Sequence, residues 1–175
     1  MSDKIPSTLT QFERLILANQ LRLLEYVDPQ NKEGYREQRT IVEHGYTLLY
    51  SDVFSGVYPE ELPIEECRYI FDVLDMYRDL HHSYKALSDK QGIKTTDVKF
   101  KGFDGNNESA RWGFTKFLHE QGKWTESLSH GAINSHSMVT MSLYPKMLAE
   151  YEQVKSKQGY DFGKMSATDI KQMIG

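Results

Sequence analysis

The sequence predicts an all-α protein, and three observations support that class. Apolar residues recur at three- and four-residue spacing over most of the chain, which is the period of an amphipathic helix. Helix-start signals precede several of these stretches, and proline or glycine follows them. Only residues 97–103 alternate as a strand does. We therefore expect a compact orthogonal bundle of five to six helices, with at most a small two-stranded β element.

The first two helices are predicted over residues 7–27 and 31–52. Asp28 precedes Pro29 and ends the first helix, because the residue before proline is pushed out of the α region. Gly45 falls inside the second helix at a cost of about 1 kcal/mol relative to Ala, so we expect close packing by another helix there. The first helix has a broad apolar stripe, which predicts contacts with several neighbours or with a second chain; its members are Phe12, Leu15, Ile16, Leu17, Leu21, Leu23, Leu24 and Val27.

The third helix has the clearest signals and is predicted from Pro63 or Ile64 to Ser88. Proline in the first turn with two glutamates after it is typical of a helix start. The stretch 54–63 before it is predicted to be a loop. One side of this helix is apolar and carries Cys67, Ile70, Phe71, Leu74, Tyr77, His81 and Tyr84. The opposite side is predicted to be a solvated charged stripe of Glu65, Arg68, Asp72, Asp75, Asp79 and His82.

Further elements follow the third helix. A turn is predicted next, and Asp104 or Asn106 in it is expected to cap the N-terminus of the following helix, which ends at Gly122. Residues 123–134 are ambiguous, and Trp124 and Leu128 are candidates to pair with the extended segment 97–103. A helix with a methionine-rich face is predicted over 137–157 and must be kinked or started by Pro145. In the last helix, 166–174, Ser166 and Asp169 resemble a capping box, and we expect 1–7 and 158–165 to be irregular.

Composition narrows the classes of function. The chain has 175 residues, which suits a single domain over 1–175. Its net charge is −4 without any run of Lys or Arg, so we do not expect nucleic-acid binding. The single cysteine, Cys67, excludes an intrachain disulfide and a cysteine-based metal site. The polar first eleven residues and the lack of a long apolar run predict a cytoplasmic protein without a membrane partner.

Four residues are candidates for a binding or catalytic cluster: Glu43, Tyr46, Tyr77 and His81. Tyr77 and His81 share the apolar side of the third helix, and antiparallel packing of the second helix would bring Glu43 and Tyr46 toward them. Such a group of side chains could act in general acid–base chemistry. The alternative is a purely structural hydrogen-bond network, which we consider the stronger interpretation.

Other arrangements of polar residues give weaker evidence for a functional site. Asp75, Asp79 and His82 lie on one helix face and could hold a divalent ion, but a solvated surface is the simpler interpretation. His119, His130 and His136 match no zinc spacing. The sequence contains no phosphate-binding loop, dinucleotide-binding glycine motif or nucleophile elbow. We therefore expect no metal site and no cofactor, and we do not favour an enzyme.

Several patches of sequence follow one another in the order and at the spacing of a known protein family. The first is the segment ERLILANQ, residues 13–20, and the next is IVEHGY, residues 41–46. Shorter matches follow at Glu66-Cys67-Arg68, Met76-Tyr77 and the segment FKGFD, residues 100–104. These patches resemble the YfbU family of bacterial proteins, which has no established reaction. The resemblance implies a compact, cytosolic, self-associating helical domain, and it transfers no catalytic residue.

Two functions remain as hypotheses. The broad apolar side of the first helix and the methionine-rich side of the helix over 137–157 favour a regulatory module that forms a homo-oligomer or binds a protein partner. The alternative is a small-molecule or metal-dependent enzyme that uses Glu43, Tyr77 and His81.

Overall fold

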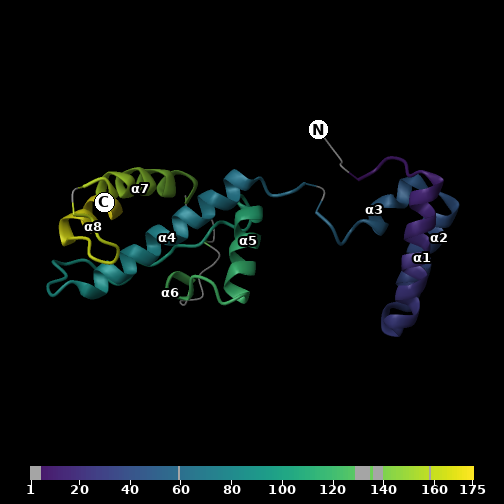
Figure 1. Ribbon diagram of the computed structural model, residues 1–175, viewed down its shortest axis with the longest axis horizontal. Helices are drawn as coiled ribbons and strands as arrows, with labels where there is room; N and C mark the ends of the chain where they lie inside the picture. Colours follow the sequence, from purple (N-terminus) through teal and green to yellow (C-terminus); the bar gives the residue numbers. More distant parts are fainter. Residues whose placement is uncertain (1–4, 59, 129–134, 136–139, 158) are drawn as a thin grey trace. The chain divides into compact units, whose positions relative to one another are not determined.

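The computed structural model describes residues 5–58, 60–128, 135, 140–157 and 159–175. In these ranges the fold is all-α, as the periodicity predicts, and contains no strand. The chain forms two compact units, Met1–Glu61 and Leu62–Gly175 (Figure 1). These units are defined by their internal contacts, whereas a domain is also a unit of cooperative folding. The expectation of a single domain over 1–175 therefore stays a prediction.

The N-terminal unit is built on two antiparallel helices that lie side by side (Figure 1). Its elements are α1 (Gln11–Val27), η1 (Pro29–Asn31), α2 (Lys32–His44), η2 (Thr47–Leu49) and α3 (Tyr50–Val53). The packed core of this unit is small: Ala18 and Leu21 of α1 meet Val42 of α2. Only a narrow stripe of α1 is therefore used within its own unit.

The predicted second helix, 31–52, is wrong at its C-terminal end. The chain leaves the α conformation at Gly45, whose φ of +69° is the left-handed conformation that closes many helices. Its amide N–H donates back to Val42 at 3.2 Å. A short 3-10 turn and the four-residue α3 take the remaining length. Gly45 is thus a helix stop, which a positive φ requires, and not an interior residue.

The C-terminal unit is organised around one long helix, α4, which contacts every other helix described in that unit. Its elements are α4 (Ile64–Ala86), α5 (Ser109–Glu120), α6 (Thr125–Leu128), α7 (Thr140–Lys155) and α8 (Ala167–Ile174). Twenty buried apolar or aromatic residues form its core within the described ranges. Tyr77, Phe100, Phe103 and Tyr144 lie at its centre, with ring centroids 5.4–5.9 Å apart.

Local signals located most helix ends of the C-terminal unit correctly. α4 follows Pro63, and Gly122 follows α5 with a φ of +67°. Ser166 and Asp169 form the predicted capping box: the Asp169 N–H donates to the Ser166 hydroxyl at 3.2 Å, and the Asp169 carboxylate accepts from the Ser166 N–H at 3.1 Å. Pro145 lies inside α7, and residues 137–139 lie outside the described ranges.

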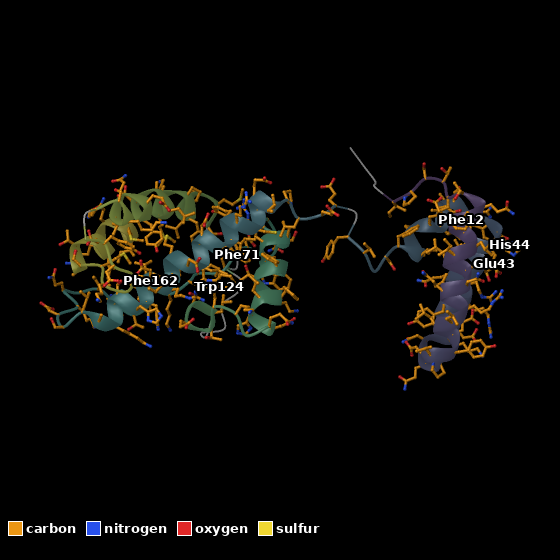
Figure 2. All side chains as sticks on the ribbon, in the orientation of Figure 1. Phe12, Glu43, His44, Phe71, Trp124 and Phe162 are labelled. Carbon is orange, nitrogen blue, oxygen red and sulfur yellow. The ribbon has the colours of Figure 1, made fainter. Side chains whose placement is uncertain are left out.

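The β element allowed by the sequence is absent from the described residues. Residues 97–103 run from a turn through irregular chain to a single bridge residue at Phe103, and the apolar side chains of Val98, Phe100 and Phe103 are all buried in the core. The predicted partners of this segment lie at a short helix instead: Trp124 immediately precedes α6, and Leu128 ends it. The Trp124 ring packs 4.8 Å from Phe71 of α4 (Figure 2). Alternation here reflects burial in a helical core and not strand pairing.

Candidate functional site

The start of α1 is fixed by a capping box that the sequence only partly predicts. Ser7, Thr8 and Thr10 are all candidate caps, and the structure uses Thr10. Its hydroxyl accepts from the Glu13 N–H at 3.2 Å, and the Glu13 carboxylate accepts from the Thr10 N–H at 2.7 Å. These reciprocal bonds satisfy two backbone donors at the helix end and set the direction of α1.

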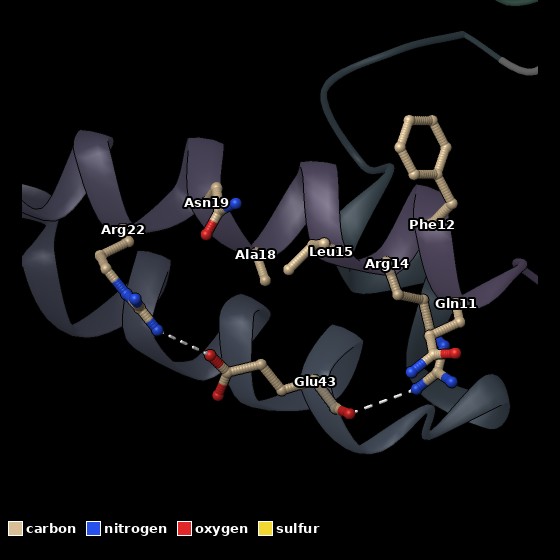
Figure 3. Close-up of a pocket in the computed structure, with 8 residues that line it drawn as sticks. All are labelled: Gln11, Phe12, Arg14, Leu15, Ala18, Asn19, Arg22 and Glu43. Atoms are coloured by element: carbon tan, nitrogen blue, oxygen red, sulfur yellow. Dashed lines mark hydrogen bonds and ion pairs between the residues drawn. The ribbon is translucent and has the colours of Figure 1, made fainter.

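Arg14 ties the start of α1 to the end of α2. Its Nη1 donates to the carbonyl oxygens of Val42 at 3.4 Å and Glu43 at 3.2 Å (Figure 3). These carbonyls belong to the last turn of α2, where acceptors lack helical partners and a cation is favourable. Gly45 leaves room for this contact, because a Cβ at that position would lie 3.1 Å from Arg14 Nη1.

A charged cluster fixes the other side of the same helix pair. Arg39 Nε lies 2.6 Å from Glu25 Oε1, and Arg39 Nη1 lies 2.9 Å from Glu43 Oε1. Arg22 Nη2 reaches the same Glu43 oxygen at 3.3 Å. The hydrogen bond from Arg39 lowers the pKa of the Glu25 carboxyl below its usual value. The predicted site residue Glu43 is therefore a partner of two arginines that join α1 to α2.

The other side of α1 is apolar and points away from α2. We call it the outer face of α1; it consists of Phe12, Leu15, Ile16, Leu23, Tyr26 and Val27, with exposed fractions of 70, 57, 41, 64, 82 and 79%. None of the six side chains carries a charge. Figure 2 labels Phe12, which stands clear of the helix pair. Such a surface costs free energy in water, at about 25 cal/mol per Å² of apolar area.

A groove runs along the edge of this face between α1 and α2 (Figure 3). It has a volume of about 520 Å³. Phe12, Leu15 and Ala18 supply its apolar surface, and Asn19 lies among them on α1. Arg14, Arg22 and Glu43 bring charges to the groove, and all three are held by the contacts described above. The groove thus combines apolar side chains with charged side chains that their own contacts hold in place.

The remaining predicted site residues lie in different places. Tyr46 is in the N-terminal unit, half-exposed, with its ring 5.4 Å from His44. Tyr77 is buried in the core of the C-terminal unit, where its hydroxyl donates to Met147 Sδ at 3.5 Å and burial raises its pKa. His81 is partly buried on α4, with its ring 6.0 Å from that of His82. Within neither unit are the four residues brought together, so the acid–base cluster stays a prediction.

Met147 corrects the expectation of a methionine-rich interaction face on the helix over 137–157. Its side chain is buried in the core beside Tyr77, because α7 packs against α4 along this side. Met141 is exposed, and Met138 lies outside the described residues. The described part of α7 therefore presents one exposed methionine and not a continuous face.

Asp79 was predicted on a solvated stripe, and this prediction is wrong. The carboxylate is fully buried and accepts four hydrogen bonds. The donors are the Ser83 hydroxyl at 3.1 Å, the Tyr151 hydroxyl at 3.0 Å, the Gly163 N–H at 2.6 Å and the Tyr160 hydroxyl. Burial raises the pKa of both tyrosines, to about 12 for Tyr160, so both keep their protons and donate at neutral pH. The network fastens the irregular segment 159–165 to α4 and α7.

The sequence carries a signal that α4 is buried on more than one side. Val73, Met76 and Leu80 recur at three- and four-residue spacing on a side of α4 next to the predicted apolar one, and all three are fully buried. This second apolar stripe shows that α4 is surrounded by neighbours. Asp75, the other carboxylate of the proposed metal site, accepts from Trp124 Nε1 at 2.6 Å. Among the described residues no group of three His, Cys, Asp or Glu side chains is placed to hold a metal ion.

A second buried acid, Glu108, also went unrecognised. Its carboxylate accepts from the Asp104 N–H at 3.1 Å and from the Thr140 hydroxyl, and it pairs with Arg111 at 3.0 Å. Arg111 also pairs with Glu66 of α4 at 2.7 Å. Like the Asp79 network, this one joins segments that are distant in the sequence, and it adds polar contacts to the core of the C-terminal unit.

Together, these features define a helical protein with one well-packed unit and one unit whose longest helix presents an apolar side. The chain matches the model of the YfbU domain over residues 7–175, which includes nearly all of both units, and it belongs to the YfbU family. None of the helices in the described ranges is long and apolar enough to cross a membrane.

Proposed function

We propose that this YfbU-family protein acts as a self-associating helical module and that the outer face of α1 is its contact surface. The observation that carries the proposal is the set of six large, uncharged side chains on one side of one helix, five of them more than half exposed. Apolar patches of this kind on a folded protein usually mark an interaction site.

The size of the outer face supports the proposal. Six large apolar side chains present on the order of several hundred Å², and a standard protein interface takes roughly 800 Å² from each partner. The aromatic residues Phe12 and Tyr26 lie toward opposite ends of the face. Aromatic residues dominate the binding energy of many interfaces. One helix therefore supplies most of the area and the type of side chain that a stable contact needs.

The small core of the N-terminal unit gives a second reason. Domains of about 60 residues are marginally stable even when they bury a normal share of their surface. Here the packed cluster consists of Ala18, Leu21 and Val42, with Leu17, Tyr35 and Val53 partly buried around it. Covering the outer face of α1 would add apolar burial to a unit that has little of its own.

Light scattering on the purified chain tests the proposal. We expect a mass that is a multiple of 20.3 kDa at micromolar concentration. The substitution Leu23→Glu places a charge in the middle of the outer face, on a side chain that is 64% exposed, and should reduce the mass to one chain. Circular dichroism should show unchanged helix content, because Leu23 does not belong to the packed core.

Phe117→Glu is a matched control, since Phe117 is a 53% exposed aromatic residue on α5. It should leave the mass unchanged. A wild-type mass of one chain over the whole concentration range would contradict the proposal. If the chain were monomeric and Leu23→Glu increased hydrogen exchange in residues 62–175, the outer face would instead be covered by the protein's own C-terminal unit.

A further inference from the structure

The outer face of α1 contains a regular spacing that identifies the type of partner. Phe12, Ile16, Asn19, Leu23 and Tyr26 follow one another at intervals of four, three, four and three residues. This is the heptad spacing by which one helix packs along another, because it keeps the same side of both helices in contact. A helix is therefore the surface that fits this face.

Asn19 is the only amide among those five positions, and the other four side chains are mainly apolar. It is exposed, lies between Ile16 and Leu23, and borders the groove beside Leu15 (Figure 3). Its side chain forms no hydrogen bond with any residue in the described part of the chain. Removing an amide from water without a partner is costly, so any helix that covers this face must offer Asn19 a hydrogen bond.

A second copy of the same helix supplies that bond. Asn19 stands at the centre of α1, eight residues from Gln11 and eight from Val27 (19 − 11 and 27 − 19). Any two-fold arrangement that overlaps the full length of α1, parallel or antiparallel, therefore brings Asn19 opposite Asn19 of the second copy. An amide both donates and accepts, so the two side chains satisfy one another. The absence of charge along the seam means that two copies bring no like charges together.

We infer that the partner at the outer face of α1 is a second copy of this chain and that Asn19 determines the specificity of the contact. The pair of amides favours two strands in one register, because a third helix or a shifted register would bury an amide without its partner. This inference rests on the proposed self-association and adds the number of chains and the residue that sets it.

Substitutions at Asn19 test the inference by sedimentation equilibrium and light scattering. The wild type should have twice the mass of one 20.3 kDa chain. Asn19→Asp should raise the dissociation constant at neutral pH by about tenfold or more, because two carboxylates would face one another. Acidification that protonates them should restore association. Asn19→Leu should associate more tightly and produce species larger than two chains.

Gln20→Glu is the matched control, since it adds the same charge one residue away, at an exposed position outside the seam. It should remain associated at neutral pH. A dimeric wild type in which Asn19→Asp behaves like Gln20→Glu, or in which Asn19→Leu stays strictly dimeric with unchanged affinity, would overturn the role of Asn19 and leave self-association standing. A wild type of three or more chains would do the same, whereas a wild type of one chain would overturn both proposals.

Discussion

The two units of this protein are stabilised in different ways. The C-terminal unit buries twenty apolar or aromatic residues in the described ranges and locks its segments together with hydrogen-bonded acids at Asp79 and Glu108. The N-terminal unit packs three such residues in its cluster and relies on partly buried ion pairs that link α1 and α2. Burial per residue explains why one unit is complete on its own while the other leaves a helix face uncovered.

The same contrast separates two kinds of polar residue. Buried acids accept bonds from donors fixed by the fold, so removing them leaves unsatisfied groups in a place that water does not reach. The ion pairs of the N-terminal unit lie closer to solvent, from the partly buried Arg39–Glu25 pair to the more exposed Arg22–Glu43 pair, so solvent screens them and they contribute less. Mutations in the two units should therefore change the free energy of unfolding by different amounts. A different spectroscopic signal should be used to follow each unit.

The largest effect is expected for Asp79→Ala. It would leave four donors in the C-terminal unit without their acceptor, and we expect the free energy of unfolding to fall by on the order of 4 kcal/mol. Urea denaturation followed by tryptophan fluorescence measures this unit, because Trp112 and Trp124 both lie in it. Asp72→Ala, on an exposed position of the same helix, should change stability by less than about 0.5 kcal/mol.

Val42→Ala should destabilise the N-terminal unit by about 2 kcal/mol, because it removes two methyl groups from a very small core. We expect circular dichroism to record an early loss of helix, while the tryptophan transition of the C-terminal unit keeps its midpoint. If the two signals shifted together, the chain would fold as one cooperative domain, as the sequence predicts. The two units would then differ in their internal contacts but would not unfold separately.

Glycine substitutions within the N-terminal unit separate backbone strain from packing. Gly45→Ala should lower stability by about 1 kcal/mol, because φ is +69° and the added Cβ would lie 3.1 Å from Arg14. Gly34→Ala, inside α2 with nothing within 4 Å of the new Cβ, should raise stability by up to about 1 kcal/mol. Thermal melts of both variants should therefore shift in opposite directions, and shifts in the same direction would disprove the assignment of Gly45 as the helix stop.

The smallest effect is a pH dependence at Glu25. Its pKa is lowered in the folded state by the hydrogen bond from Arg39, so its contribution to stability is present above the ordinary pKa and is lost as pH falls through the lowered one. The free energy of unfolding of the wild type and of Glu25→Gln should be measured between about pH 6 and pH 3, with helix content as the signal for unfolding. The difference in stability between the two proteins should shrink on acidification, and a constant difference would show that the ion pair contributes nothing.

Local signals in the sequence were enough to predict the helices and most of their ends. Pro63, Gly122 and the Ser166–Asp169 capping box act on their own backbone neighbours, so their effect does not depend on the rest of the fold. The apolar excess on α1 was also visible, because a stripe wider than one neighbour can cover follows from spacing alone. For this reason the candidate contact surface was partly predictable.

Only the tertiary structure determines which polar residues are buried in hydrogen-bond networks that hold the fold together. Asp79 is buried because Tyr151, Tyr160 and Gly163 donate to it across 72 to 84 residues of sequence, a distance that no local pattern reports. The assignment of Glu43 and Tyr46 to one unit and of Tyr77 and His81 to the other was equally outside the reach of periodicity. Spacing along a chain determines which side chains share a helix face, whereas contacts between distant segments determine what that face meets.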